Sequence, residues 1–289
     1  MKPLTPSQTI EFVIDALMMK EVAYIAGVPA IGKSSVIKQV AKQFNLKLIT
    51  EYLSQKLPED LTGLPTMNEK TKKAEYIPFD TFPLEGDVVP DGYDGWLIFL
   101  DELSSSSQEI MAAVYSLILE RTIGGRKLHP KALMVAAGNR STDSAIARPL
   151  PDTLITRMLV CEMKTDSTNW LAWAAEPENN GHTSIISFIT KYPDLLLGTV
   201  KPENRAELET YPTPRGWEKM FKIIKLHEKK SKNTQLTRKD SAGVPVGGAY
   251  TPGAIITPGI LNLMNGAIGI TGAKSFQEHY DESIQLPYP

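Results

Sequence analysis

A glycine-rich loop near the N-terminus carries the clearest chemistry in this sequence. It matches G-x-x-x-x-G-K-[ST] at every fixed position, and with the next serine it gives a predicted phosphate-binding set of Gly27, Val28, Pro29, Ala30, Ile31, Gly32, Lys33, Ser34 and Ser35. Glycines let backbone N–H groups turn towards a phosphate, and Lys33 supplies a positive charge. The Ser34 hydroxyl is a candidate magnesium ligand. We therefore expect this loop to bind ATP with Mg²⁺.

Two adjacent carboxylates form the second candidate feature. Asp101 and Glu102 directly follow the apolar run 96–100, which reads as a buried strand. Unpaired buried charge is costly, so an acidic pair at this position favours function over a solvated strand end. We expect Asp101 to hold the magnesium through water and Glu102 to act as general base on the attacking water. On an extended backbone the two side chains would leave opposite faces.

Alternating helices and strands are predicted to position these residues. Expected helices cover 5–20, 34–44, 107–121 and 151–157, the first capped by Ser7 with Met18 on its inward stripe. Expected strands cover 22–26, 46–52, 96–100, 133–137 and 159–163, and each is a mostly apolar run. Continuous apolar strands alternating with helices predict an α/β fold with a parallel sheet covered on both faces.

The remaining segments divide the chain into a predicted core, residues 1–164, and a smaller helical unit, residues 165–289. Pro- and Gly-rich residues 53–95 predict loops and short hairpins, and Gly124-Gly125 predicts a hairpin within 121–131. Helices are expected over 170–175, 185–191 and 215–225. The basic residues 229–239 and the Gly/Pro-rich residues 243–259 read as loops. Trp170 and Trp173 favour packing in the core of the helical unit over a nucleic-acid stacking platform.

Composition narrows the function further. The chain has 289 residues, 42% of them hydrophobic, with 31 basic and 33 acidic residues and a net charge of −2. That balance disfavours a protein that coats DNA. The single cysteine, Cys161, reads as a small buried hydrophobe, and the four histidines lack metal-ligand spacing. Without a signal-peptide pattern or an apolar run long enough to span a membrane, we expect a soluble cytoplasmic protein with no membrane partner.

Taken together, the motifs resemble those of AAA+ ATPases. Residues 27–34, Asp101-Glu102 and residues 136–139 look like the Walker A, Walker B and sensor 1 elements of that family. Residues 57–65 and 150–158 are similar to two segments of its MoxR branch, and residues 213–217 look like the start of a sensor 2 helix. The resemblance covers roughly residues 20–225 and implies a P-loop NTPase core of the AAA+ type with a helical lid.

This resemblance also implies roles for single residues. Asn139 would orient the attacking water, although a turn asparagine after Gly138 is the structural alternative. Arg157 resembles the arginine finger that reaches a neighbouring subunit's γ-phosphate, with Arg140 and Arg148 as rivals and a surface arginine at a helix end as the alternative. Arg215 resembles sensor 2, contacting the phosphates from the lid. Arg140 stands where the MoxR branch has proline.

A finger supplied in trans implies a homo-oligomer, most simply a ring of six subunits, although a helical assembly stays open. The resemblance places a helix-2 insert at 66–95 and a hairpin insertion at 121–130, both expected to contact a client protein. We expect a MoxR-like remodeller whose partner carries a von Willebrand factor A-type domain, encoded by a phage and working in the bacterial cytoplasm. The alternatives are a nucleic-acid motor or loader, and a nucleotide-switched filament protein.

Overall fold

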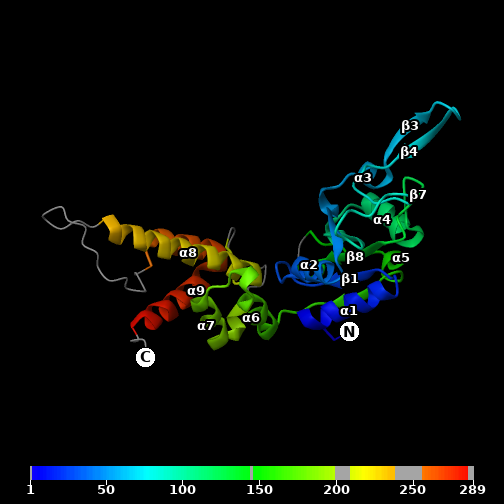
Figure 1. Cartoon of the computed structure of the whole chain (residues 1–289). Helices are drawn as coiled ribbons and strands as arrows, with labels where there is room; N and C mark the ends of the chain where they lie inside the picture. Colours follow the sequence, from blue (N-terminus) through cyan, green and yellow to red (C-terminus); the bar gives the residue numbers. More distant parts are fainter. Residues whose placement is uncertain (1, 144–145, 199–208, 238–255, 286–289) are drawn as a thin grey trace. The chain divides into compact units, whose positions relative to one another are not determined.

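The computed structural model describes residues 2–143, 146–198, 209–237 and 256–285. The chain divides into two compact units, residues 1–164 and 165–289 (Figure 1). Each unit encloses a hydrophobic core of its own, the first around Leu100 and Val114 and the second around Phe188 and Trp217.

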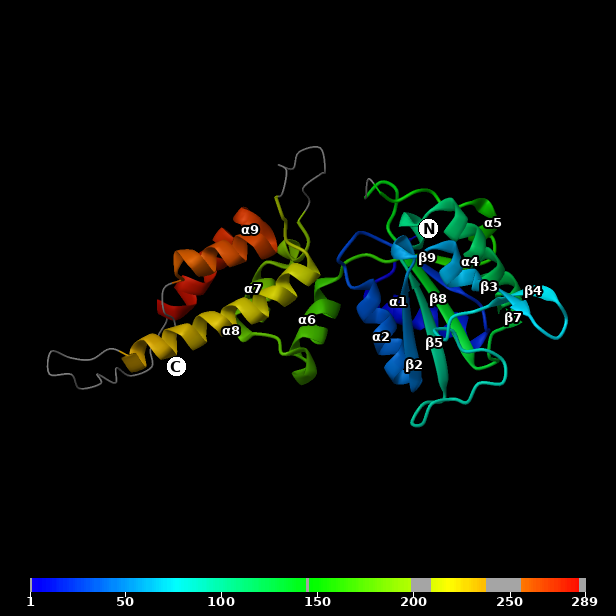
Figure 2. The same cartoon turned by 90° about the horizontal axis from the view of Figure 1, so that it is seen from above.

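A five-stranded parallel sheet organises the first unit. Its strands are β1 (Ala23–Ala26), β2 (Leu46–Tyr52), β5 (Gly95–Asp101), β8 (Ala132–Gly138) and β9 (Leu159–Glu162), in the order β2-β5-β8-β1-β9. All seven residues of β5 are buried because helices cover both faces of the sheet. Helices α1 (Pro6–Met18) and α2 (Lys33–Gln43) lie against one face, and α4 (Gln108–Glu120) lies against the other (Figure 2). The predicted α/β fold is confirmed.

Two details predicted for α1 are wrong. Its N-cap is Thr5, whose hydroxyl accepts a hydrogen bond from the Gln8 N–H while the Gln8 side chain accepts one from the Thr5 N–H. Pro6 begins the helix, a position where proline's missing N–H costs nothing, so the cap falls one residue before it rather than at Ser7. The buried stripe ends at Leu17, and Met18 is 72% exposed.

Short elements surround the sheet. A one-turn segment η1 (Leu53–Gln55) and the helix α3 (Pro58–Thr62) lead into an antiparallel hairpin of β3 (Leu64–Asn68) and β4 (Lys73–Ile77). This hairpin projects from the unit in Figure 1. A second small hairpin, β6 (Thr122–Ile123) with β7 (Arg126–Lys127), lies within the other predicted insertion. The remaining short elements are η2 (Leu103–Ser105) and α5 (Asp152–Ile155).

The second unit consists of helices, as predicted, but they extend further than the sequence suggested. They are α6 (Ser167–Ala175), η3 (Pro177–Asn179), α7 (Thr183–Lys191), η4 (Pro193–Leu196), α8 (Pro214–Thr237) and α9 (Pro258–Gln285). Residues 229–237 continue α8 instead of forming a loop; Arg238 and Lys239 lie outside the described residues. Helix α9 was not predicted, and Gly259 lies in its first turn rather than in a loop. Of the predicted loop, Ile256 and Thr257 precede α9 without regular secondary structure, Pro258 begins the helix, and residues 243–255 fall outside the described residues.

Two further interpretations concern packing. Trp170 is buried in the core of the second unit and Trp173 packs against it partly buried, as expected for structural tryptophans. Cys161 is buried in β9, and burial raises the pKa of its thiol to about 12, so the thiol stays protonated. Among the described residues, no helix is long and apolar enough to cross a membrane.

Candidate active site

The phosphate loop joins the end of β1 to the start of α2. Gly32 is the N-cap of α2 in a left-handed conformation (φ 103°), and no side chain caps the helix. The Ser35 and Val36 N–H groups donate to the Gly32 carbonyl, at 3.0 and 3.1 Å, and close the first turn. A helix start without a side-chain cap, preceded by a turn with Ala30 at φ 64°, is a suitable site for an anion.

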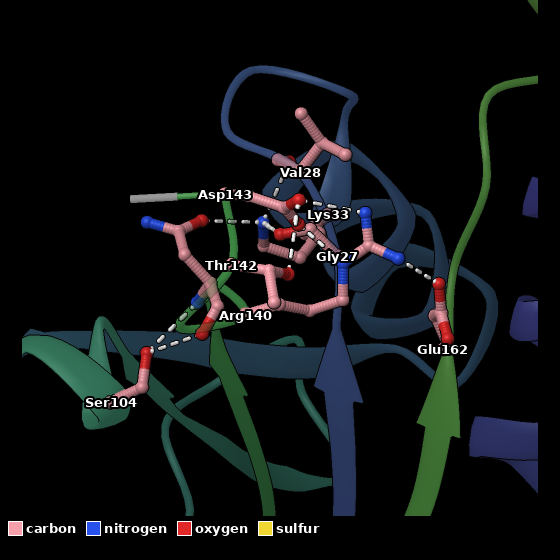
Figure 3. A network of polar contacts seen from close by, with 9 residues as sticks. Gly27, Val28, Lys33, Ser104, Arg140, Thr142, Asp143 and Glu162 are labelled. Carbon is pink, nitrogen blue, oxygen red and sulfur yellow. Dashed lines mark hydrogen bonds and ion pairs between the residues drawn. The ribbon is translucent and has the colours of Figure 1, made fainter. Parts of the chain in front are cut away.

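Lys33 connects this loop to a strand that lies far away in the sequence. Its side chain is buried, and its ammonium donates to the carbonyls of Gly27 (2.8 Å) and Val28 (3.0 Å) and to Asn139 Oδ1 (3.0 Å) (Figure 3). These three acceptors match the three donors of an ammonium group. The charge is therefore fixed at the mouth of the loop, where an anion's phosphate groups would lie.

Ser34 and Asp101 meet at the same edge. The Ser34 hydroxyl donates to Asp101 Oδ2 at 3.2 Å, and the Glu102 N–H donates to Asp101 Oδ1 at 2.8 Å. Burial raises the pKa of the Asp101 carboxyl above its usual range, while these two hydrogen bonds and the Lys33 charge oppose the rise. A hydroxyl and a carboxylate side by side are ligands that Mg²⁺ accepts, so the residues present fit the predicted cation.

Glu102 lies at this edge with a backbone that differs from the predicted extended form. It is left-handed (φ 59°, ψ 28°) and forms the N-cap of η2, so the idea of two acids on opposite faces of a strand is wrong. Its carboxylate accepts a hydrogen bond from the Ser54 hydroxyl, which follows β2. Sequence reasoning missed Ser54. The usable signal was a polar residue just beyond a strand whose carboxyl end reaches the site edge.

Asn139 is held through its backbone as well as its side chain. The Ser104 hydroxyl donates to the Asn139 carbonyl at 2.9 Å and accepts from the Asn139 N–H at 2.9 Å (Figure 3). Ser104 is 1% exposed and is also hydrogen-bonded to Tyr24, whose pKa burial raises to about 12. Ser104 was missed because the run 104–107 is all serine and nothing in the sequence distinguishes its members.

The predicted arginines lie in different surroundings. Arg157 donates to the Thr153 carbonyl at 2.8 Å, and its guanidinium lies 4.8 Å from the ring centroid of Tyr115 on α4. Arg148 is exposed, and its N–H donates to the Ser104 carbonyl at 2.7 Å. Arg215 is exposed on α8 of the second unit. Its role as sensor 2 stays a prediction.

Arg140 differs from the other three arginines because two carboxylates of the same chain bind its guanidinium. It pairs with Asp143 through Nε and Nη2, the latter at 2.9 Å, and with Glu162 through Nη1 (Figure 3). Of the sequence-predicted residues outside the loop, the structure therefore brings Asp101, Glu102, Asn139 and Arg140 to the edge that the loop occupies.

Comparison with known proteins adds distant likenesses only. No family model matches the sequence, and no curated protein sequence is significantly similar to it. The crystal structure of a candidate ATPase from Cytophaga hutchinsonii is similar over 98% of this chain and 80% of its own, with 16% identity and a TM-score of 0.42. NtrX from Brucella abortus is similar over 76% of this chain and 50% of its own, with 13% identity and a TM-score of 0.42. The fold assignment rests on the sheet of this chain itself.

The close packing behind Asn139 gives a stability prediction. A Cβ at Gly138 would lie 2.3 Å from the Tyr24 hydroxyl and 2.6 Å from Ser104 Oγ, so Gly138→Ala should lower the free energy of unfolding by about 1–3 kcal/mol in urea denaturation. The double variant Tyr24→Phe/Gly138→Ala removes the nearer atom and should recover part of the loss. A Gly138→Ala protein as stable as the wild type would contradict this packing.

Proposed function

We propose that this chain is a Mg²⁺-dependent ATPase of the AAA+ kind, which works as an oligomer and remodels a partner protein in the manner of the MoxR branch. One observation supports the ATPase part above all others. Lys33, Ser34, Asp101 and Asn139, from three separate parts of the sequence, are hydrogen-bonded to one another or to the phosphate loop at the carboxyl edge of β1, β5 and β8. Ligands of open α/β sheets bind at this edge.

Each of these residues has a chemical role in the proposal. Lys33 exchanges carbonyl acceptors for the β- and γ-phosphate oxygens, and the α2 N-terminus adds its dipole. Ser34, and Asp101 through water, would hold a magnesium ion, which would neutralise charge on the phosphates. Glu102 accepts a proton from the attacking water, with Ser54 fixing the direction of its carboxylate. Asn139 orients that water through its amide.

The oligomeric part of the proposal depends on Arg157. Its contacts with Thr153 and the Tyr115 ring restrict the side chain, and a restricted guanidinium can stabilise developing phosphoryl charge on a neighbouring subunit at low entropic cost. Arg140, in contrast, is already bound by two carboxylates of its own subunit. A ring of six subunits is the assembly we propose, with a von Willebrand factor A-type protein as client. The exposed hairpin β3–β4, with Met67 and Tyr76, would contact that client.

A second candidate function, a nucleic-acid motor, is favoured by exposed lysines along α8. Lys222, Lys225, Lys229 and Lys230 are exposed there and could contact phosphates. Turnover of ATP with and without single-stranded DNA, double-stranded DNA and RNA distinguishes the two. A severalfold stimulation by any of them would favour the motor over the remodeller.

Two substitutions should separate nucleotide binding from hydrolysis. Lys33→Ala removes the buried charge at the loop and should abolish ATP binding, measured with a fluorescent ATP analogue. Glu102→Gln keeps the shape of the side chain but cannot take a proton, so it should bind ATP normally while turnover falls by about a hundredfold or more. Near-normal turnover in Glu102→Gln would exclude Glu102 as the base.

Mixed assemblies test the proposed finger. Arg157→Ala should lose ATP hydrolysis because the neighbouring site lacks its guanidinium. When Arg157→Ala is mixed with Glu102→Gln, an interface can combine an intact Glu102 with an intact Arg157, and turnover should partly return. If no mixture recovers activity, Arg157 does not act in trans.

A further inference from the structure

An ion-pair cluster of Arg140, Asp143 and Glu162 lies next to Asn139, and the proposed reaction gives it no role. The Arg140 guanidinium faces the Asp143 carboxylate side-on and uses its remaining Nη1 for Glu162. The Asp143 N–H donates to the Arg140 carbonyl at 3.0 Å, which closes a four-residue turn directly after Asn139. The side chain and the backbone therefore fix the same short segment.

The position of Glu162 makes this cluster a bridge. Glu162 is the last residue of β9 and pairs in register with Ala26, the residue before the phosphate loop. Since β1 lies between β8 and β9, the Arg140–Glu162 contact crosses the end of β1 where the loop begins. Figure 3 shows Arg140 reaching from the segment after β8 towards Glu162 at the end of β9. Asn139 is thus anchored on one side by Ser104 and, through Arg140, on the other side by β9.

We propose that Arg140 is a positioning residue that acts within its own subunit: its bridge to Asp143 and Glu162 holds Asn139 in place beside Lys33 for hydrolysis. This inference rests on the proposed ATPase function. It assigns to Arg140 a role in cis, whereas the sequence left it as a rival for the finger in trans.

The value of the bridge lies in geometry rather than in stability. The three side chains retain relative exposures of 37%, 16% and 27%, and ion pairs at such exposure contribute little to folding. A guanidinium, however, offers a planar fork that fits one carboxylate with two hydrogen bonds and leaves a third donor for another. A misplacement of about 1 Å at a reacting centre can cost about a hundredfold in rate.

Because of the charges in this cluster, a substitution in it should affect ATP affinity and the rate of turnover differently. Arg140 contributes one positive charge, and Asp143 and Glu162 contribute two negative charges beside a site for an anion. Glu162→Ala removes a negative charge and cuts the bridge at β9, while Arg140 keeps Asp143. This variant should therefore bind Mg-ATP as tightly as the wild type or more tightly, yet turn it over more slowly. A general structural defect would weaken both.

The first experiment compares Arg140→Lys and Glu162→Ala with the wild type, measuring kcat and, separately, the affinity for a fluorescent ATP analogue. Arg140→Lys keeps the charge but loses the fork, so affinity should stay within about twofold while kcat falls about tenfold or more. Glu162→Ala should show the same fall with equal or tighter binding. A kcat near that of the wild type in both variants would overturn the proposal. If Arg140→Lys fails to fold, Glu162→Ala decides.

The second experiment mixes Arg140→Ala with Glu102→Gln, using the Arg157→Ala mixture as the matched control. A residue that acts in cis cannot be supplied by a neighbour, so the Arg140→Ala mixture should stay inactive while the control recovers. Recovery in the Arg140→Ala mixture would overturn the proposal and make Arg140 the finger. A wild type that binds no ATP, or does not hydrolyse it, would instead refute the proposed function.

Discussion

The arrangement of the sheet's carboxyl edge depends on the buried ammonium group of Lys33 and its hydrogen-bond acceptors. Lys33 is only 8% exposed, and a buried charge without partners would cost far more than this unit could offset. Its acceptors are two carbonyls of its own loop and the amide oxygen of Asn139. Asn139 is within reach only because β8 is the neighbour of β1 in the sheet. The hydrogen bonding of the Lys33 ammonium therefore depends on the order of the strands in the sheet.

Other features of the first unit follow from this requirement. Asn139 must stay at the end of β8, and Ser104 holds its backbone from the β5 side. Gly138 leaves room for the Ser104 and Tyr24 hydroxyls, which a larger residue would displace. Across the sheet, Asp101 is buried beside Ser34, where desolvation works against its charged form until a cation compensates. Positive and negative groups at this edge thus depend on one another and on the proposed ligands.

The sequence revealed the elements better than it revealed the contacts. The bounds of β2 matched those expected, and those of β5 differed by one residue at each end. Strand β5 is buried along its whole length, and such a strand is recognisable in a sequence as an apolar run that ends at polar residues. The phosphate loop and the acidic pair were visible because their residue types are unusual at strand ends. The partners Ser54 and Ser104 were not, since each lies 35 or more residues from the group it contacts, and only the strand order brings them together. The left-handed turn at Glu102 was not visible because residues other than glycine rarely adopt a positive φ, and no glycine marks the position. Helix α9 was missed because its glycines obscure the helical pattern, and one of them, Gly269, interrupts the helix with φ 75°.

The central claim is that the Lys33 loop and Asp101 form one site for a magnesium nucleotide. Equilibrium titration of ATP into the wild type and into Asp101→Asn, each with Mg²⁺ and with EDTA, tests it most directly. Mg²⁺ should strengthen ATP binding to the wild type by about tenfold or more, and this gain should be mostly lost in Asp101→Asn. Absence of ATP binding to the wild type, or an equal Mg²⁺ effect in both proteins, would contradict it.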